Sequence, residues 1–141
     1  MTLDEAAAIA DIKTKVAVDD QHILRKEAGL ELIPRERNQP LSIDDVAALC
    51  GYADLRRAGY PVKLAGTIIS RVRAGMRDDP DEPRHTFVLL ANGSTFALPT
   101  SILDLRSGYT SGSYVVAATI VDVRNLRERV KRQIGAENVA A

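Results

Sequence analysis

Residues 85–99, HTFVLLANGSTFALP, decide the fold class, because the spacing of apolar residues changes here from a helical period to the alternation of strands. Two runs of strand-forming residues flank Asn92-Gly93, the pair that is favoured in two-residue hairpin turns of type I′. The stretch therefore predicts an antiparallel hairpin with that turn. Further along, YVVAATIVDV at 114–123 predicts a third strand, apolar on both faces and so central in a sheet or packed at an interface.

The residues at the start of the chain predict two helices. The first, TLDEAAAIADI, starts at the capping residue Thr2. The β-branched residues of KTKVAV, at 13–18, predict a break after it. A second, short helix then begins at Asp19 or Asp20 and ends at Gly29.

Two longer helices are predicted between residues 42 and 77. Ser42 caps the third helix with Asp45 in its first turn, and Gly59 ends it. Pro61 is well placed to open the fourth helix. Apolar stripes at helical spacing consist of Ile43, Val46, Ala47, Cys50 and Ala53 in the third helix, and of Ala65, Ile68, Ile69, Val72 and Met76 in the fourth.

Together these elements predict an α+β fold, in which N-terminal helices precede a small antiparallel β-sheet and a closing helix. An acidic, proline-containing linker, RDDPDEPR, separates a helical region at 1–77 from a β-rich region at 84–135. Residues 136–141 are predicted to be a frayed tail. The closing helix, RNLRERVKRQI, carries an apolar stripe of Leu126, Val130 and Ile134.

Charge is unevenly distributed along the chain, although the net charge is zero. Residues 35–77 hold eight basic and four acidic side chains, whereas the segments on either side are acidic overall. Zero net charge argues against a uniformly basic protein of the histone kind, but a basic middle segment suits a surface that faces a polyanion. A solvated helical face explains the same count, and both interpretations stay open.

Several classes of function lack their residues in this sequence. A single Cys and two His predict no internal disulfide, no metal site and no cofactor. There is no phosphate-binding glycine loop and no nucleophile with an evident base, so the chain is not predicted to be an enzyme. Without a signal peptide or a run of roughly 18 apolar residues, a cytoplasmic protein with no membrane partner is expected.

The segment LELIPRERNQPL, at 30–41, cannot be helical throughout, because Pro34 and Pro40 bracket a short loop within it. The tip of this loop holds Arg35, Arg37, Asn38 and Gln39. Arginine neutralises phosphate, and the side-chain amides of Asn and Gln match the edge of adenine. The loop therefore indicates contact with nucleic acid, although a charged loop that only improves solubility has the same composition.

With EAGLELIPRERN, SIDDVAAL and ADLRRAGYPVKLAGTII in this order, residues 20–76 resemble the winged helix-turn-helix DNA-binding domain of mercury-resistance-type (MerR) regulators. The resemblance rests on the order and spacing of the pieces and implies a winged-helix N-terminal region that binds double-stranded DNA. The chain departs from the family pattern in three ways. HILRKE has no aromatic residue where the family has Arg-Tyr-Tyr or Arg-Tyr-Trp, the turn through KTKVAVD is long, and a β-region replaces the long dimerisation helix.

The resemblance also implies roles for particular residues. Arg35, Arg37 and Asn38 in the wing are expected to lie against phosphate and the minor groove. His22, Arg25 and Lys26 on the second helix are expected near the major groove. The remaining members of the predicted DNA-binding set are Gln39, Arg73 and Arg77.

The β-region requires an explanation of its own, because a hairpin by itself is only marginally stable in water. The third strand either completes a sheet within one chain or forms a two-fold dimer interface. A homodimer is favoured, because DNA-binding regulators commonly pair to read two half-sites. The predicted dimer interface consists of Val115, Val116, Ile120, Leu126, Val130 and Ile134.

The resulting prediction is a sequence-specific, DNA-binding transcriptional regulator that acts as a homodimer. One alternative is a protein-interaction module, an adaptor or inhibitor that docks through its β-region. The other is an architectural DNA-binding protein of the excisionase or packaging type.

Overall fold

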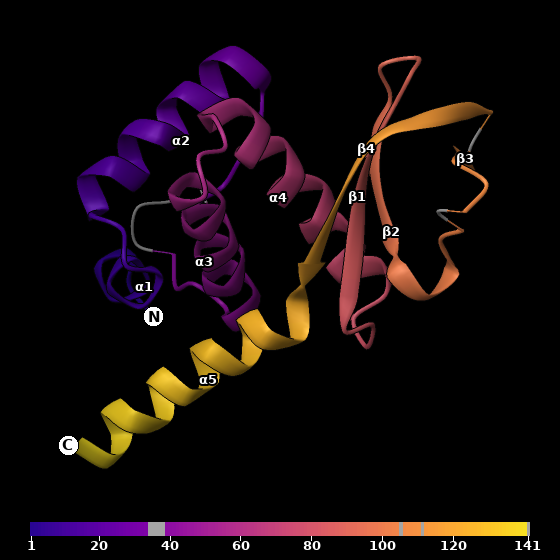
Figure 1. The fold of residues 1–141 in the computed structure, drawn as a ribbon. Helices are drawn as coiled ribbons and strands as arrows, with labels where there is room; N and C mark the ends of the chain where they lie inside the picture. Colours follow the sequence, from indigo (N-terminus) through magenta and orange to yellow (C-terminus); the bar gives the residue numbers. More distant parts are fainter. Residues whose placement is uncertain (34–38, 105, 111, 141) are drawn as a thin grey trace. The chain divides into compact units, whose positions relative to one another are not determined.

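The computed structural model describes residues 1–33, 39–104, 106–110 and 112–140 of the 141-residue chain, and its fold is α+β, as predicted (Figure 1). Its elements are α1 (Leu3–Ala10), α2 (Thr14–Ala28), α3 (Ile43–Arg57), α4 (Val62–Asp78), β1 (Arg84–Leu90), β2 (Thr95–Pro99), the short 3₁₀-helix η1 (Thr100–Ile102), β3 (Tyr109–Thr110), β4 (Ser113–Asp122) and α5 (Val123–Ala140). The chain divides into two compact units, residues 1–70 with 125–141 (unit 1) and residues 71–124 (unit 2). The boundary thus falls inside α4 and differs from the predicted linker.

Side-chain caps fix where helices of unit 1 begin, at the residues that the sequence indicates. The Oγ1 atom of Thr2 accepts a hydrogen bond from the backbone N–H of Glu5 at 3.2 Å, which caps α1. Ser42 and Asp45 form a reciprocal capping box at the start of α3, with distances of 3.1 and 2.9 Å. α4 begins directly after Pro61. These local hydrogen bonds satisfy backbone groups that the first helical turn leaves unpaired.

The predicted break at residues 13–18 is wrong, because α2 begins at Thr14 and runs through this segment. The chain turns earlier, at Asp11, whose φ of 54° lies in the left-handed region and whose N–H bonds to carbonyl groups of α1. β-Branched residues lower helix propensity by less than about 1 kcal/mol each. Burial of Ala17 in the core of unit 1 favours the longer helix.

The core of unit 1 surrounds α3. Residues 46–53 are all buried, so α3 is covered on every side in this stretch. A Cβ atom built on Gly51 would lie 2.9 Å from Cδ1 of Ile69 in α4 and 3.1 Å from Cδ1 of Leu126 in α5. Both helices therefore approach α3 closely at this glycine. The predicted apolar stripes of α3 and α4 are confirmed, apart from Ile43, which is exposed in the first turn of α3.

A buried polar pair joins α2 to α3. The hydroxyl of Tyr52 donates a hydrogen bond to Oδ2 of Asp20 at 2.6 Å, and Nε of Arg56 lies 3.8 Å from the same oxygen. Burial, followed by the hydrogen bond to the Asp20 carboxylate, raises the pKa of Tyr52 above its ordinary value of 10.0. The fold therefore stabilises the neutral form of this phenol.

Replacement of Tyr52 by phenylalanine is expected to lower the free energy of unfolding by about 1–3 kcal/mol at neutral pH, because the Asp20 carboxylate loses its hydroxyl donor. The pKa of the phenol is raised in the folded state, so its contribution is complete below about pH 10 and is lost as the pH rises further. Urea unfolding at neutral pH and at about pH 10.5 measures both effects. The wild type should lose more stability than Tyr52→Phe between the two conditions, and equal losses would contradict the assignment.

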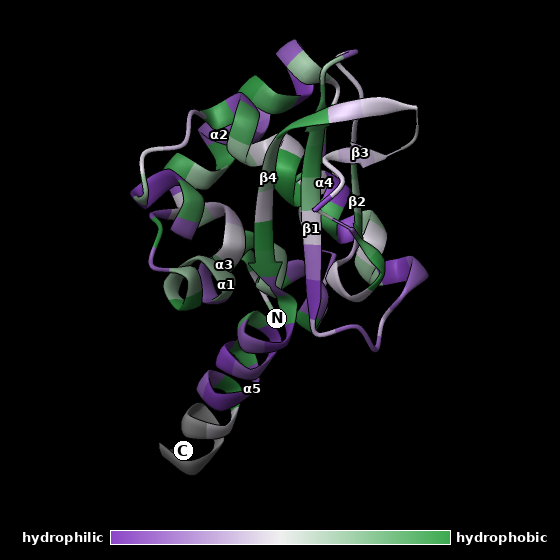
Figure 2. Cartoon of the chain, turned by 45° about the vertical axis from the view of Figure 1, so that its right-hand side comes forward, coloured by the Kyte–Doolittle hydropathy of each residue, from purple (hydrophilic) through white to green (hydrophobic). Residues whose placement is uncertain are grey.

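Unit 2 is a four-stranded antiparallel sheet in the order β2-β1-β4-β3, together with the last turns of α4. β1 pairs with β2 over residues 85–89 and 95–99, which confirms the hairpin, and β4 confirms the third strand. Figure 2 shows hydrophobic stretches along both β1 and β4. His85 is buried, and a Cβ on Gly75 of α4 would lie 2.8 Å from its Nδ1. Helix and sheet thus meet closely at this glycine.

The turn of the hairpin is not of type I′. That turn requires a positive φ at both central residues, and among the described non-glycine residues only Asp11 has one. Gly93, with a φ of 87°, donates to the carbonyl of Leu90 at 2.9 Å, and the N–H of Leu90 donates to the carbonyl of Ser94 at 2.9 Å. These bonds describe a three-residue loop with a glycine bulge. Asn92 instead uses its Oδ1 to accept from the N–H of Ser94 at 2.9 Å.

Candidate nucleic-acid interface

α2 buries only a narrow stripe of its surface, although it is 15 residues long. The buried side chains recur at helical spacing and are Ala17, Asp20, Gln21 and Leu24. The exposed side chains include Lys15, Asp19, His22 and Lys26. At 1.5 Å per residue the helix is about 22 Å long, and the major groove of DNA, about 12 Å wide, admits an α-helix. Within unit 1, α2 therefore offers a long open face to a ligand.

Gln21 ties the segment that follows α2 back onto the helix. Its side-chain oxygen accepts hydrogen bonds from the backbone N–H groups of Leu32 and Ile33, the latter at 2.5 Å. Its side-chain amide donates to the carbonyl of Leu30 at 3.0 Å. Gln21 and Leu32 are both buried. One glutamine thus fixes the backbone immediately before the basic loop at 34–40.

The far end of the loop is also anchored in unit 1. The N–H of Leu41 donates to the carbonyl of Met1 at 2.9 Å, and α3 starts directly afterwards at its Ser42 cap. The loop residues Arg35, Arg37 and Asn38, which were predicted to contact DNA, lie outside the described residues. Gln39 is described and is exposed. Both attachment points of the loop are therefore defined.

The remaining residues of the predicted DNA-binding set fall into different units. His22, Arg25 and Lys26 lie on α2 in unit 1, where Nε of Arg25 is 3.9 Å from the carboxylate of Glu31. Arg73 and Arg77 lie on the part of α4 that belongs to unit 2, where Arg73 is half-buried and Arg77 is exposed. The structure thus brings the three α2 residues together on one helix.

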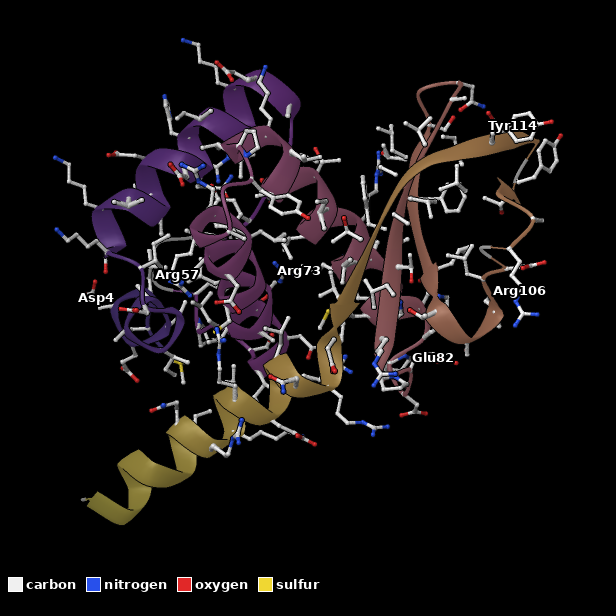
Figure 3. All side chains as sticks on the ribbon, in the orientation of Figure 1. Asp4, Arg57, Arg73, Glu82, Arg106 and Tyr114 are labelled. Atoms are coloured by element: carbon white, nitrogen blue, oxygen red, sulfur yellow. The ribbon has the colours of Figure 1, made fainter. Side chains whose placement is uncertain are left out.

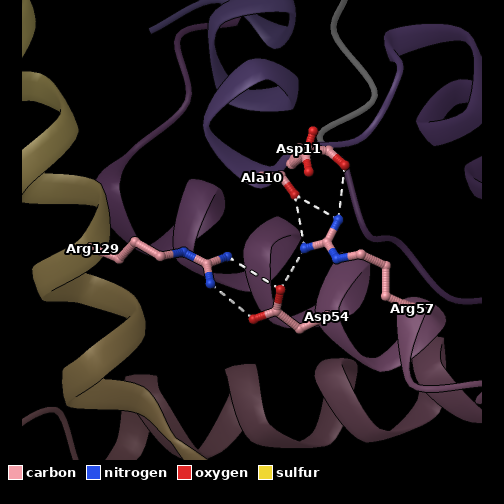
Figure 4. Close-up of polar contacts among 5 residues, drawn as sticks. All are labelled: Ala10, Asp11, Asp54, Arg57 and Arg129. Carbon is pink, nitrogen blue, oxygen red and sulfur yellow. Dashed lines mark hydrogen bonds and ion pairs between the residues drawn. The ribbon is translucent and has the colours of Figure 1, made fainter.

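Part of the basic surplus of the middle segment serves the internal structure of unit 1. Arg57 donates to the carbonyl of Asp11 at 2.8 Å, and also bonds to the carbonyl of Ala10 and to Asp54 (Figure 4). Arg129 of α5 donates to the other side of the Asp54 carboxylate at 2.9 Å. This cluster joins α1, α3 and α5. The count of basic residues in the middle segment therefore overstates the positive charge available to a ligand. The spacing of residues within a helix could not predict these bonds, because their partners lie far away in the sequence.

Cys50 is buried in the core of unit 1, as the stripe of α3 predicts, and burial raises the pKa of its thiol. Within the described part of the chain, no group of three or more His, Cys, Asp or Glu side chains is arranged to hold a metal ion. No helix in that part is long and apolar enough to cross a membrane.

The side chains predicted for the dimer interface differ in how exposed they are. Val116 and Ile120 on β4 are exposed, and Val115 is half-buried. Leu126 and Val130 on α5 are buried within unit 1, where Leu126 contacts α3 at Gly51. This corrects the prediction for those two residues, because side chains in the core of one chain have little surface left for a second. Ile134, further along α5, is half-buried.

Comparisons with models of protein families, with curated proteins and with solved structures find no match to this chain. The fold is therefore described by its own elements: a helical unit with an exposed helix and an anchored basic loop, and a small antiparallel sheet.

Proposed function

We propose that unit 1 binds double-stranded DNA and that the protein regulates transcription as a homodimer. One observation supports this most directly: α2 exposes most of its surface, and its buried Gln21 holds the backbone directly before the basic loop. In this arrangement α2 enters the major groove and the loop lies against the phosphate backbone. The function implies a cytoplasmic location, no cofactor and no catalysed reaction.

The charges on α2 indicate how strongly DNA binding should depend on salt concentration. Lys15 and Lys26 add positive charge to its exposed surface, whereas Asp19 reduces it. Glu27 lies 3.4 Å from Nζ of Lys63, which offsets its charge. With two lysines and two loop arginines, each copy is expected to neutralise about three or four phosphates, which corresponds to a salt-dependence slope of roughly −3 to −4. With so few phosphate contacts, tight binding to DNA also requires contacts to bases and the pairing of two protein copies in a homodimer.

The proposal predicts that Lys15→Ala with Lys26→Ala weakens DNA binding and reduces the magnitude of the salt slope by about 2, because two phosphate contacts are lost. The measurement is fluorescence anisotropy at several salt concentrations between about 50 and 200 mM, with DNA fragments selected from a random library. A matched control removes two exposed cations from α5, in Lys131→Ala with Arg132→Ala.

A parallel variant, Arg35→Ala with Arg37→Ala, tests the loop against the same control. Both test variants should bind more weakly than the control, and the selected fragments should contain an inverted repeat. Equal affinity in all proteins, or no wild-type binding at about 50 mM salt, would contradict the proposal. Tight binding without enrichment of any sequence would point to an architectural role.

A further inference from the structure

Unit 2 exposes large apolar side chains on its last two strands. The exposed fractions are 50% for Tyr109, 66% for Tyr114, 65% for Val116 and 54% for Ile120. Tyr109 and Tyr114 are paired across β3 and β4, with ring centroids 5.2 Å apart, and Figure 3 labels Tyr114 on β4. Large apolar side chains that are exposed on two neighbouring strands mark a candidate site of interaction.

One edge of β4 is largely open. β4 pairs with β1 along its length, but β3 covers its other edge only at residues 113–114, with one further backbone bond from Val115 to Gly108. Among the described residues, no strand pairs with this edge between residues 116 and 122. The backbone groups on the open edge are suited to pairing with another strand.

Natural edge strands usually carry a proline, a charge or a short length that prevents such pairing. β2, at the opposite edge of the sheet, has only five residues and ends at Pro99. β4 has ten residues and contains no proline, and no charged residue occurs before Asp122. Asp122 itself lies 3.7 Å from Nε of Arg84 on the neighbouring strand. The bulge in the pairing of β4 with β1, between Val115 and Ala117, lies near the end that β3 covers, so residues 117–121 of the open edge carry none of these protections.

We infer that a second copy of the chain pairs with this edge, so that two β4 strands run antiparallel across a two-fold axis. The residue at the centre of the open stretch 116–122 is Thr119. An axis there places Ala118 opposite Ile120 of the other copy and Ala117 opposite Val121. A small side chain meets a large one in each pair, and the two threonines meet at the centre, a favourable cross-strand pair. This self-complementarity favours a second copy over an unrelated partner.

The exposed area indicates a dimer of moderate affinity. In this register only Val116 and Ile120 of the four exposed side chains lie opposite residues of the second copy, so the apolar area covered per copy is small. Stable interfaces bury about 800 Å² per partner, so the remainder has to come from the paired backbone. We therefore expect dissociation to be observable at micromolar concentrations.

Disulfide trapping tests the register directly. In a Cys50→Ala background, Thr119→Cys places two thiols opposite each other, with Cα atoms about 4.5–5.5 Å apart, within the range that a disulfide spans. Mild oxidation at about 50 μM should give a covalent dimer on a non-reducing gel. The control Ile102→Cys presents a thiol at a site that is 69% exposed but outside β4, and it should cross-link less.

Sedimentation over about 1–200 μM tests the pairing without a cross-link. Ile120→Lys introduces a charge at an exposed position of β4 and should shift the protein to monomer, whereas the control Ile102→Lys should stay dimeric. The inference would be overturned if the wild type stayed monomeric throughout this range and the Thr119→Cys variant formed no disulfide-linked dimer. This holds even if β4 bound some other protein. Circular dichroism checks that each variant is folded.

The self-pairing deepens the homodimer of the proposed function but does not rest on DNA binding, so a failure to dimerise and a failure to bind DNA are distinguishable. If both hold, Ile120→Lys should still bind a single half-site but lose its preference for the inverted repeat. If DNA binding is absent, the dimer and its disulfide should persist unchanged.

Discussion

Replacement of Leu24 should give the largest loss of stability in unit 1, and replacement of Gly66 should give a related loss, because the two residues share one close contact between α2 and α4. A Cβ atom built on Gly66 would collide with Cδ2 of Leu24, a side chain that is fully buried. Leu24→Ala is expected to cost about 2–5 kcal/mol through lost burial and an unfilled cavity. Gly66→Ala is expected to cost about 1–3 kcal/mol through overpacking, even though alanine favours the helix by up to about 1 kcal/mol.

The double variant separates this contact from general effects on the helix. Because Leu24→Ala removes the atoms that Gly66→Ala would strike, the second change should cost little or even stabilise the protein in that background. Gly135→Ala in α5 is the control, since nothing lies within 4 Å of its added Cβ, and it should be neutral or stabilising. Urea unfolding followed by circular dichroism measures all four proteins. Additive losses in the double variant would show that the two side chains do not share this contact.

Replacement of Gln21 by leucine should also lower the free energy of unfolding strongly, by about 2–4 kcal/mol. It removes every hydrogen bond by which the side chain holds the backbone of Leu30, Leu32 and Ile33. Each buried backbone group that loses its partner costs about 1–3 kcal/mol. Gln21→Glu is the matched control at about pH 4, near the ordinary pKa of glutamate, because its protonated side chain keeps an oxygen that accepts from Leu32 and Ile33 and a hydroxyl that can donate to Leu30. Its loss of stability should be clearly smaller.

The same pair of variants connects stability to the proposed DNA binding. Under conditions where both proteins are folded, Gln21→Leu should bind DNA more weakly than Gln21→Glu, because the backbone at Leu32 and Ile33, directly before the basic loop, is no longer held against α2. Anisotropy titration of each, corrected for the folded fraction, gives the comparison. Equal DNA affinity of the two variants would separate Gln21 from the function and leave it a purely structural role.

Local chemistry made parts of this fold predictable from the sequence. Thr2 and Ser42 act on backbone groups only a few residues away, so their capping roles follow from neighbouring residues alone. The alternation around Gly93 likewise predicts the hairpin. The exact turn was not predictable, because Asn92 bonds to the N–H of Ser94 and avoids the conformation that type I′ requires.

The candidate site was only partly predictable, for a related reason. The sequence placed His22, Arg25 and Lys26 on a helix, which the structure confirms as α2. The predicted basic loop falls mainly on residues outside those that the structure describes. The sequence did not identify Gln21, because a glutamine in an amphipathic helix is normally exposed. Its hydrogen-bond partners are backbone groups, which every residue type has, so the sequence gives no sign of them.

What the sequence by itself determined about this protein is its α+β class, most helix starts, the hairpin and the apolar stripes, all of which depend on short-range periodicity and capping. Only the tertiary structure decided where the charges and apolar side chains of distant segments are used. Arg57 and Arg129 meet at Asp54 inside unit 1, and Leu126 is buried against α3, whereas Ile120 remains exposed on β4. The physical reason is that burial and ion pairing depend on which elements meet in space, and that is settled by packing over the whole chain.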